Sequence, residues 1–232
     1  MKKIVLLLLL SPAALCGQKS VHEAWGRMLS TYVSETGQVN YAAWQKEAKA
    51  LDAYIEALQF HVPPAEAPQN QQMAFWINAY NALTVQLILQ NYPLNSIRDL
   101  YRPWKRTVFQ AGEQSYSLGD IEHRILRKMG DPRIHFAINC ASVSCPQLSR
   151  EVYSSRRLDD QLQQAGIRFL NDPTKNEVTG NRWILSKIFL WFSGDFGGKK
   201  GKVEHIRALL ELPEGNTPQL GYKKYDWRLN QD

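Results

Sequence analysis

The residues with the greatest capacity for chemistry gather in one short stretch, residues 131–146. Its side chains include nucleophiles, a base and hydrogen-bonding groups: His135, Asn139, Cys140, Ser142, Ser144 and Cys145. A cysteine attacks as its thiolate, so it needs a nearby base or a lowered thiol pKa. The stretch therefore predicts a Cys/His site with Cys140 or Cys145 as the nucleophile.

Two histidines could act as the base. His135 lies within the stretch, and His123 follows Glu122 in a predicted helix. Glu122 or Asn139 would orient the histidine, while the two serines and the Asn139 amide would help to hold an oxyanion. These residues are the candidate catalytic and binding groups.

Residues 134–138 are a compact apolar run that predicts a buried strand. Alternation along a strand would place His135 and Asn139 on one face and Cys140 on the other. His135 would then not pair with Cys140 unless the next loop turned back. Cys145, beyond that loop, could return to His135, and His123 could serve Cys140.

The same cysteines permit other interpretations. Paired cysteines in an exported protein commonly form a disulfide. A Cys140–Cys145 ring is small, so it would stabilise the fold by only about 2 kcal/mol, which favours a shape-fixing clasp or a redox-active pair. A metal site would combine both cysteines with His123 and His135, but the close ligand spacing of zinc sites is absent from the sequence. No metal or other cofactor is predicted.

Two amides lie on the most apolar helix that the sequence predicts, residues 71–91. Asn78 and Asn81 are three residues apart and share one face of it. A buried amide without a partner costs about 1–3 kcal/mol. The pair either tethers a neighbouring loop or strand, or lines a polar pocket beside the cysteines as binding residues.

The N-terminal segment, residues 1–16, has the layout of a secretory signal peptide. Lys2 and Lys3 precede the apolar run 4–10, and small residues follow it. This predicts export to the periplasm or the exterior. Cys16 also permits a lipid anchor, although Leu15 fits that signal poorly. No transmembrane segment is expected after signal removal.

Residues 17–232 suit one globular domain. Loss of Lys2 and Lys3 with the signal would lower the formal net charge from +6 to +4. The one basic run, residues 199–202, is expected to be a solvated loop, because no aromatic residues interleave with it to stack on bases. Nucleic acid is therefore not an expected partner, and the expected ligand is an unidentified small molecule or peptide.

Helical periodicity predicts helices around residues 25–32, 51–58, 71–91, 158–169 and 203–210. Strand-like runs flank turn residues at 107–117 and 176–185, which predicts two β-hairpins. Ser117 and Asp120 form a capping box that begins a helix through Lys128. Helices and strands do not alternate regularly, so the expected class is α+β: a mainly helical single domain with a small central sheet and β-hairpins.

Several blocks of the sequence resemble the DUF547 family, a domain of unknown function: residues 75–84, 117–123 with 125–127, 131–146, 185–189 and 225–230. The resemblance implies a DUF547-like domain over residues 17–232. It carries no established reaction. Some eukaryotic members resemble proteins that join this domain to a glutaredoxin-like one, which favours thiol chemistry.

The sequence thus leads to one working hypothesis and two alternatives. The hypothesis is an exported domain with a Cys/His pocket that acts as a thiol-dependent hydrolase or acyl transferase on small amides or peptides. One alternative is a non-catalytic envelope domain that binds a ligand or partner and carries a structural Cys140–Cys145 disulfide. The other is a thiol redox protein.

Overall fold

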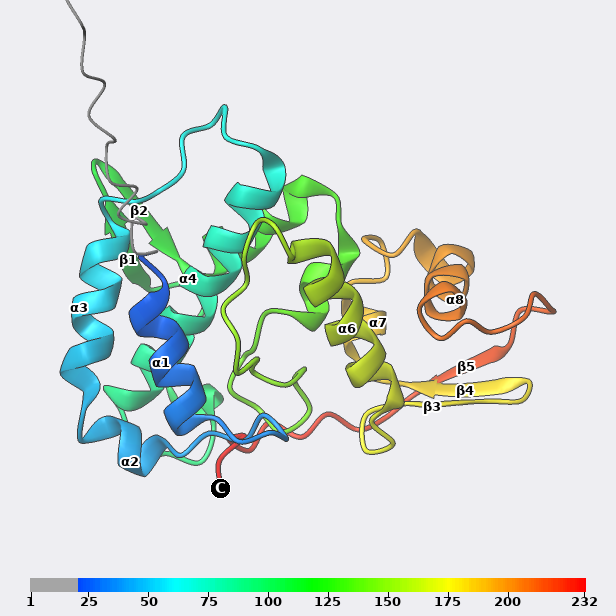
Figure 1. Cartoon of the computed structure of the whole chain (residues 1–232). Helices are drawn as coiled ribbons and strands as arrows, with labels where there is room; N and C mark the ends of the chain where they lie inside the picture. Colours follow the sequence, from blue (N-terminus) through cyan, green and yellow to red (C-terminus); the bar gives the residue numbers. More distant parts are fainter. Residues whose placement is uncertain (1–20) are drawn as a thin grey trace, which may run out of the picture.

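The computed structural model describes residues 21–232. The predicted signal peptide and Cys16 lie outside these residues. The described chain begins with four α-helices: α1 (Glu23–Tyr32), α2 (Tyr41–Gln45), α3 (Ala48–Leu58) and α4 (Gln69–Leu89). They gather on one side of the molecule (Figure 1). The predicted helices at 25–32, 51–58 and 71–91 are confirmed, whereas the short α2 was not predicted.

Helix α4 runs through the middle of this helical part. Nearly all of its residues from Met73 to Leu89 are buried, as expected for a helix that is apolar all round. Stacked rings fill the space between α1, α2 and α3, with Trp25 lying parallel to Tyr54 at 5.7 Å between centroids. Because it is buried along nearly its whole length, helix α4 gives a rigid support for the segments that pack against it.

The predicted hairpin consists of β1 (Thr107–Ala111) and β2 (Gln114–Ser117), which pair antiparallel. Ser117 and Asp120 form the predicted capping box. One irregular helical stretch follows, made of α5 (Leu118–Asp120), the π-helical η2 (Ile121–Leu126) and the 3₁₀ turn η3 (Arg127–Met129). It ends at Gly130, whose φ of 80° suits a residue without Cβ.

The predicted strand at residues 134–138 is wrong. This segment is the 3₁₀ helix η4 (Pro132–Phe136). Pro132 has its φ preset for the first turn, and the Asp131 carboxylate accepts a hydrogen bond from the backbone N–H of Arg133 at 2.9 Å. The alternation that separated His135 from Cys140 therefore does not apply.

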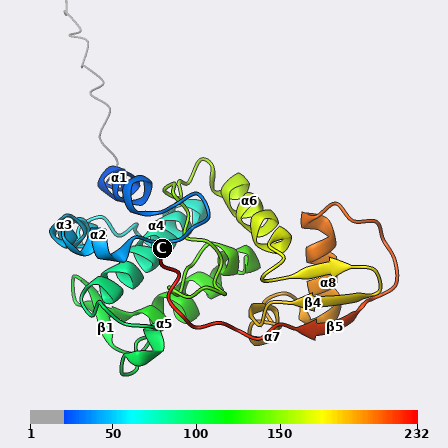
Figure 2. The same cartoon turned by 90° about the horizontal axis from the view of Figure 1, so that it is seen from below.

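The second half builds a smaller part. It contains three helices and three strands: α6 (Leu158–Asn171), β3 (Glu177–Thr179), β4 (Arg182–Leu185), α7 (Ile188–Trp191), α8 (Gly198–Leu209) and β5 (Gln219–Tyr222). The β3–β4 hairpin turns at residues 180–181 as predicted, and β5, which was not predicted, adds parallel to β4. Figure 2 shows this sheet and α8 beside the helical part.

The basic run at residues 199–202 was expected to be a solvated loop. It instead forms the first turn of α8. Lys202 is buried there, with its Nζ 3.2 Å from the hydroxyl of Tyr222. The fold class is confirmed: the chain is a mainly helical α+β protein with small sheets.

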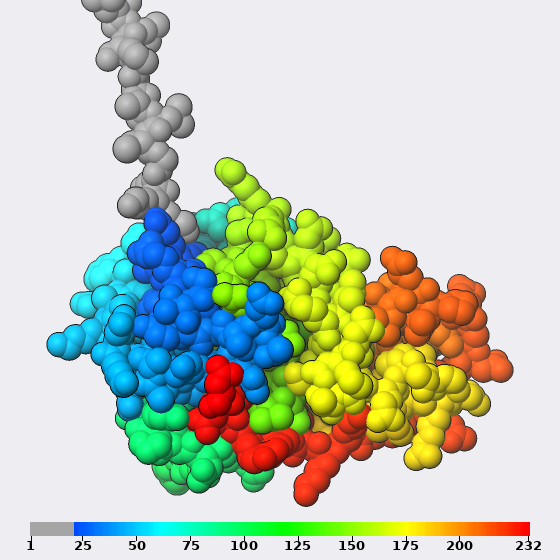
Figure 3. All heavy atoms as spheres, turned by 60° about the horizontal axis from the view of Figure 1, so that its bottom comes forward, coloured from blue at the N-terminus to red at the C-terminus, as the bar shows by residue number. Residues whose placement is uncertain are grey.

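The C-terminal segment joins the two parts. After β5 it runs back across the molecule (red in Figure 3), and Gln231 pairs with Val39 near α1. On the way, Leu229 forms a β-bridge with Ser142, and its N–H donates to the carbonyl of Asn95. The segment thereby lies against the cysteine-containing loop.

Candidate functional site

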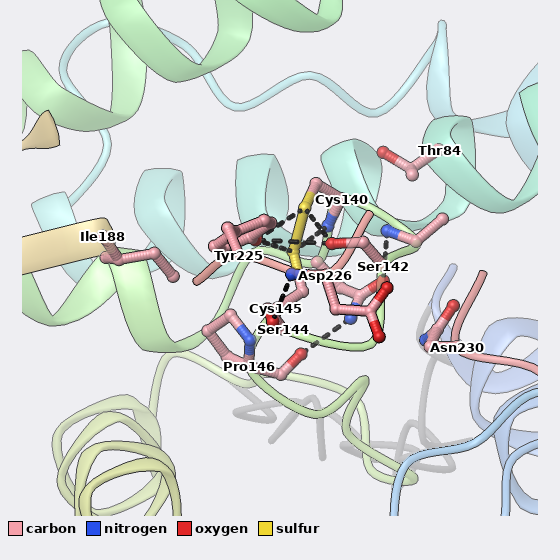
Figure 4. Close-up of a disulfide and its surroundings, with 12 residues drawn as sticks. Thr84, Cys140, Ser142, Ser144, Cys145, Pro146, Ile188, Tyr225, Asp226 and Asn230 are labelled. Carbon is pink, nitrogen blue, oxygen red and sulfur yellow. Dashed lines mark hydrogen bonds between the residues drawn. A yellow bond between two sulfur atoms is a disulfide. The ribbon is translucent and has the colours of Figure 1, made fainter. Parts of the chain in front are cut away.

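Cys140 and Cys145 form a disulfide (Figure 4). The Asn139 side chain closes the loop around it. Its Oδ1 accepts a hydrogen bond from the N–H of Ala141 at 2.7 Å, and its Nδ2 donates to the carbonyl of Pro146 at 2.7 Å. Asn139 therefore shapes the loop on both sides of the disulfide.

The C-terminal segment clamps the same loop from outside. Ser144 Oγ accepts a hydrogen bond from the N–H of Asp226 at 2.8 Å, and the N–H of Ser144 donates to the Asp226 carbonyl at 3.2 Å. Ser142 Oγ lies 3.3 Å from the hydroxyl of Tyr225. The two serines thus hold Tyr225 against the disulfide.

Hydrogen-bond donors lie within reach of both sulfurs. The Tyr225 hydroxyl lies 3.3 Å from each Sγ, and the N–H of Cys140 donates to Sγ of Cys145 at 2.9 Å. Burial, the largest cause, and the charge of Glu122 raise the pKa of Tyr225 to about 12. The phenol therefore keeps its proton at neutral pH and can donate it to a sulfur that gains negative charge.

The disulfide forms part of the wall of a pocket of about 290 Å³. The pocket lies where the two hydrophobic cores meet, since Ile138 belongs to the helical core and Ile188 to the second one. Its lining is largely aromatic and aliphatic: Tyr80, Trp104, Glu122, His123, His135, Ile138, Cys140, Cys145, Pro146, Ile188, Trp191, Phe192, Tyr225 and Trp227. An apolar pocket with a few polar groups is the usual form of a small-molecule site.

Glu122 is the buried acid of this pocket. Burial, the dominant cause, raises its pKa from 4.5 to about 7, while Arg127 and the Tyr80 hydroxyl, 3.4 Å from Oε2, oppose the rise. The negative charge of Asp195 adds to it. Glu122 can therefore take up or release a proton near neutral pH, as a general acid or base must.

The raised pKa makes stability depend on pH. The folded protein binds the Glu122 proton more tightly than the unfolded chain, so the stabilisation is complete below pH 4.5 and is lost as pH rises through about 7. Glu122→Gln stays neutral, so its stability relative to the parent should rise by about 3 kcal/mol between about pH 4 and pH 8. Denaturant unfolding of the oxidised parent and variant at the two pH values measures this difference in stability.

The control for this experiment is Glu66→Gln, which changes an exposed glutamate in a turn. It should leave the difference from the parent constant with pH. A Glu122→Gln difference that is equally flat would contradict the raised pKa of the buried Glu122.

His135 is held by a residue that the sequence did not single out. Its Nε2 lies 2.7 Å from Oδ2 of Asp195. The two oxygens of the Asp195 carboxylate also accept one hydrogen bond each from Arg127, at 2.6 and 2.7 Å. The Arg127 guanidinium lowers the pKa of Asp195 to about 2, and burial lowers the pKa of His135 to about 4. His135 is thus neutral, and it donates Nε2–H to a carboxylate that can only accept.

The predicted cysteine–histidine pairs are not formed in this oxidised protein. Across residues 21–232, no histidine has a hydrogen bond to either sulfur, although His123 and His135 line the same pocket as the disulfide. The half-exposed His123 instead lies 3.2 Å from the Arg127 guanidinium and 4.0 Å from Glu122. The candidate catalytic residues therefore share one pocket but have different partners.

Asn78 and Asn81 act as tethers. Asn81 Nδ2 donates to the carbonyl of Ala137 at 2.9 Å, and its Oδ1 accepts from the N–H of Asn139 at 2.8 Å. Asn78 forms the same two-bond pattern with the backbone of Tyr153. Both side chains are buried, and neither lines the pocket. Asn81 thus ties the backbone directly before Cys140 to helix α4.

Sequence reasoning also missed most of the pocket wall. Tyr225 and Trp227 come from the C-terminal segment, and Trp191 from α7, while Trp104 precedes β1. The aromatic character of the tail was the one available signal, and it does not by itself place these rings at the cysteines.

Across residues 21–232, no group of three or more His, Cys, Asp or Glu side chains is arranged to hold a metal ion. Among the helices of these residues, none has the length and hydropathy needed to cross a membrane.

Comparison with known proteins identifies one family. No curated protein and no solved structure matches the chain. The model of the family described as "Protein of unknown function, DUF547" matches residues 64–170, whereas the resembling blocks at 185–189 and 225–230 lie beyond the match. The matched residues, 64–170, include α4 and the disulfide, so this part of the chain is similar to the DUF547 domain.

Proposed function

We propose that this chain is an exported thiol–disulfide oxidoreductase whose Cys140–Cys145 disulfide exchanges with thiols held in the aromatic pocket. The observation that carries the proposal is the position of the disulfide. It lies in the wall of a pocket, with hydrogen-bond donors directed at both sulfurs, rather than sealed in a core. A disulfide with a structural role alone needs neither a pocket nor donors.

The two cysteines have different roles in the proposed exchange. Cys140 is partly exposed, whereas Cys145 is only 5% exposed. A substrate thiolate attacks Sγ of Cys140 and forms a mixed disulfide, and the Cys140–Cys145 bond breaks. Its electron pair leaves on Sγ of Cys145, where the N–H of Cys140 and the Tyr225 hydroxyl stabilise the thiolate. Glu122 accepts the proton of the substrate thiol.

A second thiolate completes the reaction. It attacks the substrate sulfur of the mixed disulfide and releases Cys140 as a thiolate. The substrate leaves as a disulfide, oxidised by two electrons, and the protein is left with two reduced cysteines. A different disulfide compound reoxidises the pair by the reverse steps, which returns the protein to its starting state.

Export fits this chemistry. The predicted signal at residues 1–16 would deliver the chain to an oxidising compartment, where disulfides form and persist. A fusion of residues 1–16 to a reporter enzyme that is active only outside the cytoplasm tests the export. Reporter activity is expected, and its absence would contradict this part of the proposal.

The direct test is a single-turnover reduction of the oxidised protein by a monothiol. Rapid acid quenching, alkylation and mass measurement should show a mixed disulfide and then two free thiols. The reaction should be faster than that of an oxidised peptide spanning residues 139–146, which has the ring without the pocket. A folded protein whose disulfide resists reduction better than the peptide's would support the structural alternative instead.

Tyr225→Phe should slow the exchange roughly tenfold to a hundredfold, because a hydrogen bond to a charged group contributes about 1.5–3 kcal/mol. Stopped-flow reduction by the same monothiol measures the rate. Tyr222→Phe is the matched control, since its hydroxyl contacts Lys202 rather than a sulfur. Equal rates for the two variants would show that Tyr225 stabilises no leaving thiolate.

A thiol-dependent hydrolase is the second candidate. It is favoured by the His135–Asp195 pair, because a neutral histidine oriented by a carboxylate lines the same pocket as Cys140. This function requires reduced protein. Mixing the reduced protein with a p-nitrophenyl ester should then release a burst of one p-nitrophenolate per chain. The His135→Gln variant should lose this burst. Reaction without the burst would leave redox exchange as the function.

A further inference from the structure

The composition of the pocket wall bears on which thiols can reach Cys140. Aromatic rings from separate segments line the pocket beside the disulfide. Among them, Trp191 of α7 and the tail residues Tyr225 and Trp227 contact one another at centroid distances of 4.6–5.7 Å. Trp191 is 46% exposed, which places it at the rim. A flat apolar group entering the pocket would bury these rings and gain the free energy of removing them from water.

Charge in the wall is of one kind. Within the described part of the chain no lysine or arginine lines the pocket, while the carboxyl of Glu122 does. Two arginines lie near but are otherwise engaged: Arg127 binds Asp195, and Arg98 stacks on Trp227 at 5.3 Å. An anionic thiol such as glutathione would place its carboxylates against apolar rings and an acid, with no cation to pair them.

Size restricts the ligand further. About 290 Å³ lies at the lower end of the roughly 300–1,000 Å³ that small-molecule sites span, so one ring or branched aliphatic group fills it. Building on the proposed function, we infer that the substrates are thiols carried beside an uncharged apolar group, which fills the pocket while the sulfur meets Cys140. Free apolar thiols and cysteines next to an apolar residue in a peptide share this chemistry.

Two matched pairs of thiols test the inference. Benzyl mercaptan is compared with 4-(mercaptomethyl)benzoate, and N-acetyl-Phe-Cys-amide with N-acetyl-Glu-Cys-amide. Each second-order rate constant for reduction of the protein is divided by that for the oxidised 139–146 peptide, which removes intrinsic thiol reactivity. The uncharged member should be favoured at least about tenfold, since the anion must be desolvated without a partner. The preference is the ratio of the uncharged member's relative rate to that of the charged member. A larger preference in the benzyl pair identifies free thiols as the source, and a larger preference in the dipeptide pair identifies peptides.

Variants locate the selectivity. Trp191→Ala should reduce the preference for the apolar thiol, whereas Leu190→Ala, equally exposed at 46% but outside the pocket lining, should retain it. Glu122→Gln removes the proposed proton acceptor and should slow all four thiols, but it should also narrow the gap between the charged and the uncharged member of each pair.

The outcomes separate the inference from the function on which it rests. Rates above those of the peptide with no preference in either pair would overturn the substrate class and leave the redox function standing. Rates no higher than those of the peptide with all four thiols would overturn both. Loss of the preference in Leu190→Ala but not in Trp191→Ala would also overturn the inference.

Discussion

Cys145→Ala should form a stable mixed disulfide with a small disulfide reagent about a hundredfold faster than Cys140→Ala does. In the first variant the partly exposed Cys140 remains as a free thiol at the pocket. In the second the remaining thiol is Cys145, which is only 5% exposed. Access to the sulfur limits the exchange of a buried thiol. Mass spectrometry of intact protein over time measures the trapping.

The two variants control for each other. Both lose the same small ring, so both should lose about 2 kcal/mol of stability. A difference in trapping then reports the position of the thiol and not a difference in folding. Faster trapping at Cys145 would contradict the assignment of Cys140 as the attacked sulfur.

Asn81→Ala should destabilise the oxidised protein by about 3 kcal/mol. It removes two buried hydrogen bonds and leaves the carbonyl of Ala137 and the N–H of Asn139 without partners. Denaturant unfolding at constant pH measures the change. Asn70→Ala, an exposed position in the first turn of α4, should change stability by less than about 0.5 kcal/mol.

Asn78→Ala distinguishes positioning from general stability. It also removes two buried hydrogen bonds, but these hold Tyr153 rather than the segment before Cys140. Both variants should therefore lose similar stability, and Asn81→Ala should also exchange its disulfide more slowly in the folded state. Equal exchange rates would show that Asn81 has no part in placing Cys140.

The long helices could be predicted because their apolar residues repeat over many turns. Helix α4 is buried on all sides, so its sequence is apolar throughout and leaves little ambiguity. The five residues at 134–138 gave no such signal, since a short apolar run suits a buried strand or a helical turn equally. Pro132 and Asp131 were the local evidence for a 3₁₀ start, and they favoured the helical turn.

The candidate site could be predicted in part. The cysteines, His123, His135 and Glu122 stand out by residue type, and they line one pocket. Their partners could not be found from spacing, since Asp195 lies 60 residues from His135, and Tyr225 lies 80 or more from either cysteine. The burial that raises the pKa of Glu122 is likewise a property of the packed structure and not of any sequence motif.

The reduction potential of the Cys140–Cys145 pair tests the redox function most directly. The oxidised protein is equilibrated with dithiol/disulfide buffers of defined potential, and the reduced fraction is measured by alkylation and mass spectrometry. A disulfide that cycles in function should be in reversible equilibrium at a potential above about −300 mV, with the protein folded in both states. A potential well below about −300 mV, or reduction only on unfolding, would contradict the proposal and mark the disulfide as structural.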